Sequence, residues 1–548
     1  MTTTFITSTL NVSGVAATLD GNDTLLVART GQLLSSGDNA VEATGFANVI
    51  QVDGYVAAFG AAIRLGTLNG TDTVGAISVG SSGVVTSSDN AAIVLALNNG
   101  SVTNAGSISA RNGVVSGFFE TARADLTVSN SGTMAVRNHG VLMVADSVRV
   151  SNSGTIAASD SPGGASTILG AFGNTGVSIR GSNSFVSNSG SITSPNEESF
   201  GVGMLGDANR IINSGVIQTG SMGETHAAVL LSTTAIQSGR LDNMAGGTIA
   251  APGLAVRGGL GAETVVNAGH ILGTIRLAEG TDVVTNSGQI DGTVDLGAGD
   301  DRYDASGGGL VVGSVFGGLG FDFLRGSAAD DSFFGEDDSD FLSGRGGDDT
   351  LNGGAGDDAI YGGAGEDIVE GGDGNDNVHG GADNDTVRGG NGDDALRGGG
   401  GDDLIEAGTG RDTLWGGDGD DTMTAGAGGG DTLFGGRGDD VLDTSNGAGW
   451  DRLEGGAGDD TMTSGGGNDV FVFRRGMGHD VITDFANNFD RLDISALGIA
   501  SYAVLTGAGA ISGDATQTVI NFAALGIDGT ITLDGFDRAL MNAADFIF

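Results

Sequence analysis

Aspartates recur at every ninth position through the middle of the chain, and their spacing is the strongest indication of chemistry in the sequence. The series starts at Asp322 and ends, after two slips in register, at Asp469. Glycines precede most of these aspartates, as in GGAGDDAIY from Gly353 to Tyr361. About six carboxylate and carbonyl oxygens at roughly 2.3 to 2.6 Å make a calcium site, whereas zinc would require histidine or cysteine. The pattern therefore predicts calcium binding.

The nine-residue unit has the form Gly-Gly-x-Gly-x-Asp-x-Φ-x, where Φ is apolar, and it predicts a turn followed by a short strand. The first six residues suit a tight turn because glycine accepts positive φ, and the last three suit a strand with one inward side chain. Two units would complete one coil, so that turns on the same side stack about 4.8 Å apart. Stacked carboxylates repel one another unless a cation lies between them. The expected inward residues are Leu351, Ile360, Val369, Val378, Val387, Leu396 and Ile405.

This repeat resembles the calcium-binding nonapeptide of RTX proteins, whose arrays fold into a parallel β-roll when calcium binds. The strict resemblance covers about 175 residues. It implies several Ca²⁺ ions as the cofactor. The metal-site residues that it implies are Asp322, Asp349, Asp358, Asp367, Asp376, Asp385, Asp394, Asp403, Asp412, Asp421, Asp440, Asp460 and Asp469, with the turn glycines Gly353, Gly354, Gly356, Gly362, Gly363, Gly365, Gly371, Gly372, Gly374, Gly389, Gly390 and Gly392.

Some units depart from the pattern. The units that end in Asp331 and Asp340 lack most of the turn glycines, and Asp383 stands where another unit would have its third glycine. The series gains one extra residue before Asp431 and two before Asp451. We therefore assign no site at Asp331 or Asp340, and we expect the irregular units around Asp431 and Asp451 to interrupt the calcium ladder.

A different phrase, Asn-Ser-Gly or Asn-Ala-Gly followed by alternating apolar and polar residues, recurs before the aspartate series at intervals of mostly about two dozen residues. Repeats of this length predict stacked units that bury their apolar faces only against each other. Short β-branched strands favour a right-handed parallel β-helix, and a β-sandwich is the alternative. Asparagines at equivalent turns are expected to stack as a polar ladder. They are Asn104, Asn130, Asn152, Asn188, Asn213, Asn267 and Asn286.

The predicted fold class is all-β: a right-handed parallel β-helix, then a calcium-binding parallel β-roll, then a small β-rich cap. The expected divisions are an N-terminal lead at 1–19, the β-helix at 20–296, the roll at 297–473 and the cap with a secretion signal at 474–548. Residues 297–473 hold 39 of the 69 acidic residues and only eight arginines, which marks the change in composition at the second division.

The segment from Val470 to Ser495 resembles the cap that follows RTX arrays in serralysin-type proteins. With the closing ADFIF, this resemblance implies an uncleaved C-terminal signal for a type I (ABC) exporter; an ordinary β-rich domain is the alternative. The N-terminus lacks the basic and apolar regions of a secretory signal peptide, and no apolar run is long enough to span a membrane. The absence of cysteine suits export as an unfolded chain.

The net charge of -46 argues against nucleic acid as a partner, since phosphate binding needs cationic side chains. There is no His-Glu-x-x-His motif and no Gly-x-Ser-x-Gly elbow in a strand–turn–helix setting. No histidine has a second one at ligand spacing, so we expect all of them to be surface or turn residues. They are His139, His226, His270, His379 and His479.

A polysaccharide lyase or epimerase is the main rival class, because such enzymes combine a β-helix with RTX modules. Their sites need carboxylates, cations and aromatics in a groove, but residues 1–296 contain one tyrosine and no tryptophan. The best remaining candidate is the run Glu197, Glu198 and Phe200.

These observations favour a secreted, non-enzymatic, calcium-binding structural protein at the surface or in the matrix of a Gram-negative bacterium. A surface layer, a filament or an adhesin would fit, by resemblance to RTX proteins of those kinds. The expected partners are calcium, a type I exporter, and either further copies of the chain or a cell-surface polysaccharide.

Overall fold

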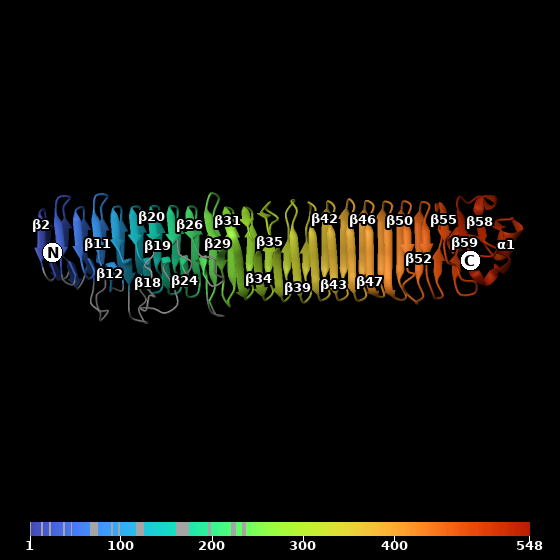
Figure 1. The fold of residues 1–548 in the computed structure, drawn as a ribbon, viewed down its shortest axis with the longest axis horizontal. Helices are drawn as coiled ribbons and strands as arrows, with labels where there is room; N and C mark the ends of the chain where they lie inside the picture. Colours follow the sequence, from blue (N-terminus) through green and yellow to red (C-terminus); the bar gives the residue numbers. More distant parts are fainter. Residues whose placement is uncertain are drawn as a thin grey trace. The chain divides into compact units, whose positions relative to one another are not determined.

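The computed structural model describes residues 2–12, 15–20, 23–36, 39–44, 47–65, 75–88, 91–96, 99–116, 125–159, 175–194, 199–220, 226–232 and 237–548. The chain divides into two compact units. Unit 1 comprises Met1–Tyr303 and Gly309–Gly313, and unit 2 comprises Asp304–Gly308 and Ser314–Phe548. Each is a stack of short parallel strands, drawn from blue to green for unit 1 and from yellow to red for unit 2 (Figure 1). The all-β parallel solenoid predicted from the sequence is confirmed.

Unit 1 is a coil with three strands to most turns, so its strands form three parallel faces. The first face consists of β1 (Thr3–Ile6), β4 (Thr24–Val27), β7 (Asn48–Val52), β10 (Gly75–Val79), β13 (Asn99–Asn104), β16 (Asp125–Asn130), β19 (Arg149–Asn152), β22 (Phe185–Asn188), β25 (Asn209–Asn213), β28 (Gly239–Asn243), β30 (Glu263–Asn267) and β32 (Val283–Asn286).

The second face follows the asparagine turn. Its strands are β2 (Thr9–Val12), β5 (Gln32–Ser35), β8 (Tyr55–Ala58), β11 (Val84–Ser87), β14 (Ser107–Ala110), β17 (Thr133–Val136), β20 (Thr155–Ala158), β23 (Ser191–Ser194), β26 (Val216–Thr219), β29 (Thr248–Arg257), β31 (His270–Glu279), β33 (Gln289–Asp291) and β36 (Leu310–Val311).

The third face closes the coil, and the long strands β29 and β31 run on into it. Its other strands are β3 (Ala17–Asp20), β6 (Val41–Thr44), β9 (Ile63–Leu65), β12 (Ala91–Leu95), β15 (Asn112–Ser116), β18 (His139–Val144), β21 (Thr175–Arg180), β24 (Phe200–Leu205), β27 (Ala227–Leu230) and β34 (Val294–Ala298).

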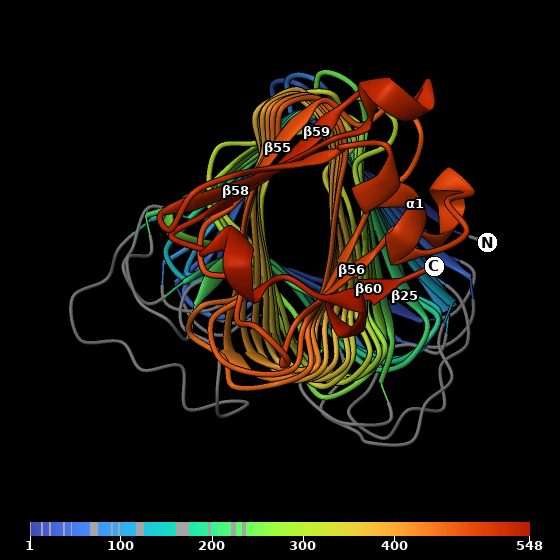
Figure 2. The same cartoon turned by 90° about the vertical axis from the view of Figure 1, so that its right-hand side faces the viewer.

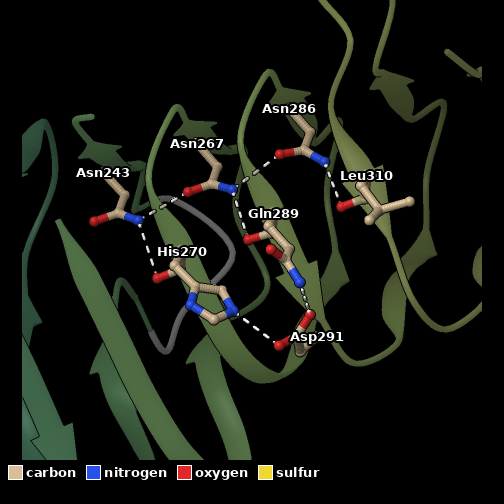
Figure 3. A network of polar contacts seen from close by, with 7 residues as sticks. All are labelled: Asn243, Asn267, His270, Asn286, Gln289, Asp291 and Leu310. Carbon is tan, nitrogen blue, oxygen red and sulfur yellow. Dashed lines mark hydrogen bonds and ion pairs between the residues drawn. The ribbon is translucent and has the colours of Figure 1, made fainter. Parts of the chain in front are cut away.

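The recurring asparagine ends a first-face strand and stacks on its neighbours inside unit 1. The Nδ2 of Asn243 donates to Oδ1 of Asn267 at 2.8 Å, and Asn267 donates in the same way to Asn286 at 2.9 Å (Figure 3). Each of these amides also donates to a backbone carbonyl of the next coil, that of His270 or Gln289. The predicted asparagine ladder is confirmed. It also includes Asn243, which the sequence phrase did not single out.

Unit 2 has two parallel faces, seen nearly end-on in Figure 2. The first consists of β38 (Phe323–Arg325), β40 (Phe341–Ser343), β42 (Ala359–Ala364), β44 (Asn377–Ala382), β46 (Ala395–Gly400), β48 (Thr413–Asp418), β50 (Thr432–Arg437), β52 (Arg452–Ala457), β54 (Val470–Val472), β56 (Arg491–Asp493) and β60 (Phe546–Ile547).

The second face of unit 2 consists of β37 (Val315–Leu319), β39 (Ser332–Asp337), β41 (Thr350–Ala355), β43 (Ile368–Asp373), β45 (Thr386–Asn391), β47 (Leu404–Gly410), β49 (Thr422–Gly428), β51 (Val441–Asp443), β53 (Thr461–Thr463), β55 (His479–Ile482) and β59 (Thr530–Asp534). β35 (Arg302–Asp304) spans the division between the units.

Two nonapeptides make one coil of the roll. Leu351 lies opposite Val369, and Val369 lies opposite Val387, so partners on one face are eighteen residues apart. All the inward residues predicted from the unit are buried, with at most 1% of each side chain exposed. One apolar side chain per unit therefore forms the core of the roll, as the spacing predicted.

The C-terminal segment continues both faces of unit 2 and adds an antiparallel hairpin. β57 (Ile511–Gly513) and β58 (Gln517–Asn521) pair antiparallel, and β58 pairs with β59. The helix α1 (Tyr502–Gly507) precedes them. The closing residues pack within this cap, because the rings of Tyr502 and Phe546 lie 5.6 Å apart.

Candidate metal centre

The regular nonapeptides place glycine at three positions of the turn. In the unit Gly353–Tyr361, the second glycine, Gly354, has φ +111° and the fourth residue, Gly356, has φ +137°. Side chains are strongly disfavoured at such angles. The first glycine, Gly353, is needed for a different reason: a Cβ there would collide with Oδ2 of Asp358 in its own unit. The twelve predicted turn glycines repeat these three roles in four units.

The sixth residue of each unit is an aspartate that points into the stack and bonds to the neighbouring coil. Oδ1 of Asp376 accepts the backbone N–H of Asp358 at 2.8 Å, and Oδ1 of Asp394 accepts that of Asp376 at 2.8 Å. This column, beside the first face, contains Asp322, Asp340, Asp358, Asp376, Asp394, Asp412, Asp431, Asp451, Asp469 and Asp490.

A second column with the same bonding stands beside the second face. It contains Asp331, Asp349, Asp367, Asp385, Asp403, Asp421, Asp440, Asp460 and Asp480. All thirteen aspartates predicted as metal-site residues therefore lie in one of these two buried columns, with at most 3% of any of them exposed.

The other carboxylate oxygen of most column aspartates has no hydrogen-bond partner among the described residues, although it is shielded from solvent. These oxygens are Oδ2 of Asp340, Asp349, Asp358, Asp367, Asp376, Asp385, Asp394, Asp403, Asp412, Asp421, Asp431, Asp440, Asp451, Asp460 and Asp469. An unpartnered buried carboxylate oxygen is strongly unfavourable, so a bound cation is the natural partner.

In several units a backbone carbonyl oxygen approaches the same space as the orphaned Oδ2 and could serve as a further ligand. A Cβ atom added to Gly353 would lie close to Oδ2 of Asp358. The same Cβ position is 2.7 Å from the carbonyl oxygen of Gly371, in the next coil on the same side. The described residues contain no group of three or more histidine or acidic side chains around a single point. A cation in the roll would thus be held by one or two carboxylates and several carbonyls, an oxygen set that suits calcium.

Burial and like charges raise the pKa of these carboxyl groups. Burial, followed by the charges of Asp367 and Asp403, raises the pKa of Asp385 to about 7. Burial also raises the pKa of Asp367 to about 6 and that of Asp440 to about 8. Desolvation favours the protonated carboxyl, and a bound divalent cation would favour the charged one.

The irregular units do not break the hydrogen bonds of the columns, and the expected interruption of the calcium ladder at these units stays a prediction. Oδ1 of Asp431 accepts from the backbone of Asp412, and Oδ1 of Asp451 accepts from that of Asp431, both at 2.9 Å. Asp331 and Asp340 also take their places. The extra residues are accommodated between consecutive columnar aspartates, so the coil lengthens while the columns continue.

An exposed ladder runs beside the buried columns and was missed by the sequence reasoning. The fifth residue of a unit accepts a backbone N–H from the following coil: Oδ1 of Asp348 accepts from Glu366 and Oδ1 of Asp357 accepts from Asn375. The aspartates of the buried columns accept a backbone N–H from the preceding coil, so the hydrogen bonds of the two ladders run in opposite directions along the stack. The fifth position is frequently aspartate or asparagine, and this bias was the available signal.

The nonapeptide segment also matches a known protein-family model. The model of the RTX calcium-binding nonapeptide repeat (4 copies) matches residues 316–351, 334–369, 343–378, 370–405, 397–430, 426–448 and 445–476. The C-terminal half carries RTX repeats. The RTX repeats are calcium-binding sequences, so Ca²⁺ is the cation expected in the columns. No curated protein matches the chain.

Two solved structures resemble parts of this chain. The AlgE6R2 subunit of the Azotobacter vinelandii mannuronan C5-epimerase is 28% identical, and the match covers 30% of this chain and 91% of that one, with a TM-score of 0.18. The extracellular lipase LipA of Serratia marcescens is 16% identical over 42% of this chain and 40% of that one, with a TM-score of 0.17.

The histidines are engaged in structural contacts. The expectation that all are surface or turn residues is wrong for His139, which is buried beside Thr175 at 2.5 Å; burial lowers its pKa to about 4. His270 bonds to Asp291 and His479 to Thr530. The remaining two contact aromatic rings: His226 lies tilted beside Phe200, and His379 stacks on Tyr361. Of the enzyme candidate run, Glu197 and Glu198 lie outside the described residues.

Proposed function

We propose that this protein is a secreted structural protein whose RTX roll folds when it binds calcium outside the cell. The observation that supports the proposal is the set of buried carboxylate oxygens without partners, stacked coil upon coil in two columns. Among the described residues, ion pairs such as Arg388–Glu406 and Arg437–Asp418 join exposed side chains outside the columns. The columns therefore depend on a cation from solution.

Calcium concentration would act as the switch. Extracellular calcium modules bind with dissociation constants of about 10⁻⁴ to 10⁻³ M, so they remain empty in the cytosol and fill outside. Without the cation, repulsion among the acidic side chains and the entropy of the glycine turns oppose folding. Ion binding then contributes directly to the free energy of folding. RTX repeat proteins are typically secreted by Gram-negative bacteria, which fits this order of events.

Export through a type I exporter, with a signal in residues 474–548, belongs to the same proposal. In the folded chain Phe546 is buried, and the side chains of Asn542 and Asp545 form a capping box at the short helix Ala543–Asp545. The closing residues are therefore part of the folded C-terminal cap. Recognition by the exporter would therefore have to precede folding of the cap. Among the described residues, no helix is long and apolar enough to cross a membrane.

We infer a structural role, in a surface layer, a filament or an adhesin, from the character of the surfaces. Unit 1 stacks small polar residues such as Thr133 and Thr155, and unit 2 stacks exposed acidic residues such as Asp348 and Glu366. The contacts of the histidines support packing in place of catalysis. The open edge strands of a solenoid are suited to pairing with another copy. A surface polysaccharide is the other partner that this role allows.

Size-exclusion chromatography with light scattering tests the proposal on the full chain, in chelator and then in millimolar calcium, with magnesium at equal ionic strength as the control. We expect an expanded monomer in chelator and large ordered particles in calcium alone. A compact monomer in calcium would support the switch but refute the assembling role. An unchanged profile would refute calcium-dependent folding, and release or epimerisation of uronic acids by the protein would refute the non-enzymatic role.

A further inference from the structure

Unit 1 contains turns that reproduce the geometry of the RTX turns, although they precede the repeats that match the family model. The segments Gly258–Glu263, Leu277–Asp282 and Leu296–Asp301 each end in an acidic residue and follow one another at intervals of nineteen residues. All three lie in unit 1, whereas the family match begins at residue 316. The nine-residue period does not detect them, because each coil carries one such turn and not two.

The backbone of the second and third turns matches that of the roll at the two positive-φ positions, whereas Gly259 and Gly261 of the first turn do not share these angles. Ala278 and Gly280 have φ +90° and +137°, and Gly297 and Gly299 have φ +110° and +138°. The corresponding angles in the roll are +111° and +137° at Gly354 and Gly356. Because a non-glycine residue at φ +90° is strongly disfavoured, the chain retains this turn at Ala278 against a local preference.

The carboxylates of these turns also stack as they do in the roll. Oδ1 of Asp282 accepts the backbone N–H of Glu263, and Oδ1 of Asp301 accepts that of Asp282, both at 2.6 Å. Asp282 is fully buried, and its Oδ2 has no hydrogen-bond partner among the described residues. Burial raises the pKa of Asp282 to about 8, an effect to which the charges of Glu263 and Asp301 add.

A carbonyl oxygen faces the same space between the coils. The position that a Cβ of Gly258 would occupy is 2.6 Å from the carbonyl oxygen of Leu277 and 2.8 Å from Oε2 of Glu263. In the roll, Gly353 has the same relation to the carbonyl of Gly371 and to Oδ2 of Asp358. The glycine thus leaves room for a carboxylate and a carbonyl to converge, as it does in the RTX turns.

Another coil of unit 1 shows that the hydrogen bonds made at the position of Glu263 and Asp282 do not require a carboxylate. Asn209 stands in the same column, since it pairs with Gly239, which pairs with Glu263. Its Oδ1 accepts the backbone N–H of Ser184 at 2.9 Å, and its Nδ2 donates to the carbonyl of Gly206 at 3.0 Å. A neutral amide therefore makes hydrogen bonds at this position through both its oxygen and its nitrogen. Glu263 already accepts hydrogen bonds from the Ser232 hydroxyl at Oε1 and from the Gly259 N–H at Oε2. The orphaned Oδ2 of Asp282 is therefore the buried oxygen that is costly unless it meets a cation.

We propose that unit 1 holds a calcium ion of its own between the turns Gly258–Glu263 and Leu277–Asp282, bound by Oδ2 of Asp282, Oε2 of Glu263 and the carbonyl of Leu277. These are oxygen donors only, which suits calcium better than a transition metal. This site extends the calcium binding proposed for the roll and rests on it. It makes the C-terminal coils of the β-helix part of the calcium-dependent structure.

Calcium counting and amide hydrogen exchange on the full chain, with calcium as the probe, test this site. Asp282→Asn retains the Oδ1 acceptor and removes the charge, as Asn209 does naturally. We expect calcium to slow exchange over residues 258–301 in the native chain, and D282N to lose that slowing and bind about one ion fewer. Asp295→Asn, which neutralises a half-buried carboxylate paired with Arg276 outside the proposed site, should change neither quantity.

The array provides the reciprocal control. Asp376→Asn should lower the number of ions bound while retaining the slowed exchange at 258–301. If D282N binds as many ions as the native chain and keeps that slowing, the unit 1 site is refuted, and the proposed function stands. If calcium fails to slow exchange in the roll itself, the proposed function is refuted. If D282N also loses protection from exchange at residues 209–243, the variant is unfolded. The variant Glu263→Gln is then tested in its place, with ion count and amide exchange over residues 258–301 as the two measurements.

Discussion

Removing three carboxylate oxygens from one column tests whether the RTX turns act as ligands. The variant Asp358→Asn, Asp376→Asn and Asp394→Asn retains each Oδ1, which accepts a backbone N–H from the preceding coil, and replaces each orphaned Oδ2 by a neutral amide nitrogen. At a free calcium level about ten times the dissociation constant, each lost ion removes about 1.4 kcal/mol of stabilisation. Three lost ions amount to about 4 kcal/mol if the sites are independent.

The calcium concentration at half-maximal folding, followed by circular dichroism, reports this loss. If about ten ions are taken up in one transition, about 4 kcal/mol corresponds to a roughly two-fold higher midpoint. The matched control is the triple variant Asp357→Asn, Asp402→Asn and Asp420→Asn, at exposed fifth positions whose Oδ1 atoms also accept backbone N–H groups. It changes the net charge equally and should leave the midpoint nearly unchanged. Equal shifts in both variants would indicate general charge repulsion, and no shift in either would refute the assignment of ligands.

Four further outcomes are expected. Asn188→Ala should lower the local stability of unit 1 by about 3 kcal/mol, measured by amide exchange, because it removes a hydrogen-bond partner from the buried amides of Asn152 and Asn213. The control Ser214→Ala, at an exposed neighbouring residue, should cost under about 0.5 kcal/mol. Equal effects of the two variants would contradict the stabilising role of the asparagine ladder. Acidification from pH 7.5 to 4.5 should increase the β-structure of the calcium-free chain. Burial raises the pKa of column aspartates such as Asp340 and Asp367 to about 6 to 8, so over this range the folded chain binds protons that the unfolded chain, with pKa values of about 4, releases. Loss of structure over this window would contradict the burial of these carboxyl groups. Asp383→Gly should stabilise the roll by about 1 kcal/mol in calcium, because Asp383 has φ +76°, and a lower thermal midpoint would contradict this. Deletion of residues 474–548 should abolish secretion by a type I exporter, and normal secretion would place the signal elsewhere.

The repeated parts of the fold were predictable because each unit carries its own local instructions. A glycine turn followed by one apolar residue determines both the direction of the chain and the inward position, so Leu351 and Ile360 could be placed without knowledge of distant contacts. The cap has no repeat to count. Its antiparallel hairpin β57–β58 and the helix α1 depend on packing against other elements, and the sequence predicted only that the segment is rich in strands.

The column positions could be predicted from the nine-residue spacing, even at Asp349 and Asp385, whose turns carry Arg345 and Asp383 in place of a glycine; calcium binding by these aspartates stays a prediction. Glu336 and Arg345 have φ +84° in positions where the template expects glycine, so the roll keeps its turn despite the unfavourable residue. Tertiary stacking overrides local preference there, which a template of single units cannot represent. Asp282 was overlooked because it lies among asparagine phrases. The signal that could have found it is the Gly-x-Asp element at 280–282, repeated nineteen residues later at 299–301.

The columns of unit 2 tolerate unequal coil lengths. Consecutive column aspartates are separated by eighteen residues through most of the roll, by nineteen from Asp412 to Asp431, by twenty from Asp431 to Asp451 and by twenty-one from Asp469 to Asp490, and the hydrogen bond forms in every case. Gene duplication or slippage during replication can therefore add or remove coils, and can alter individual turns, without disturbing the neighbouring coils. Selection can therefore adjust the length of such an array in small steps.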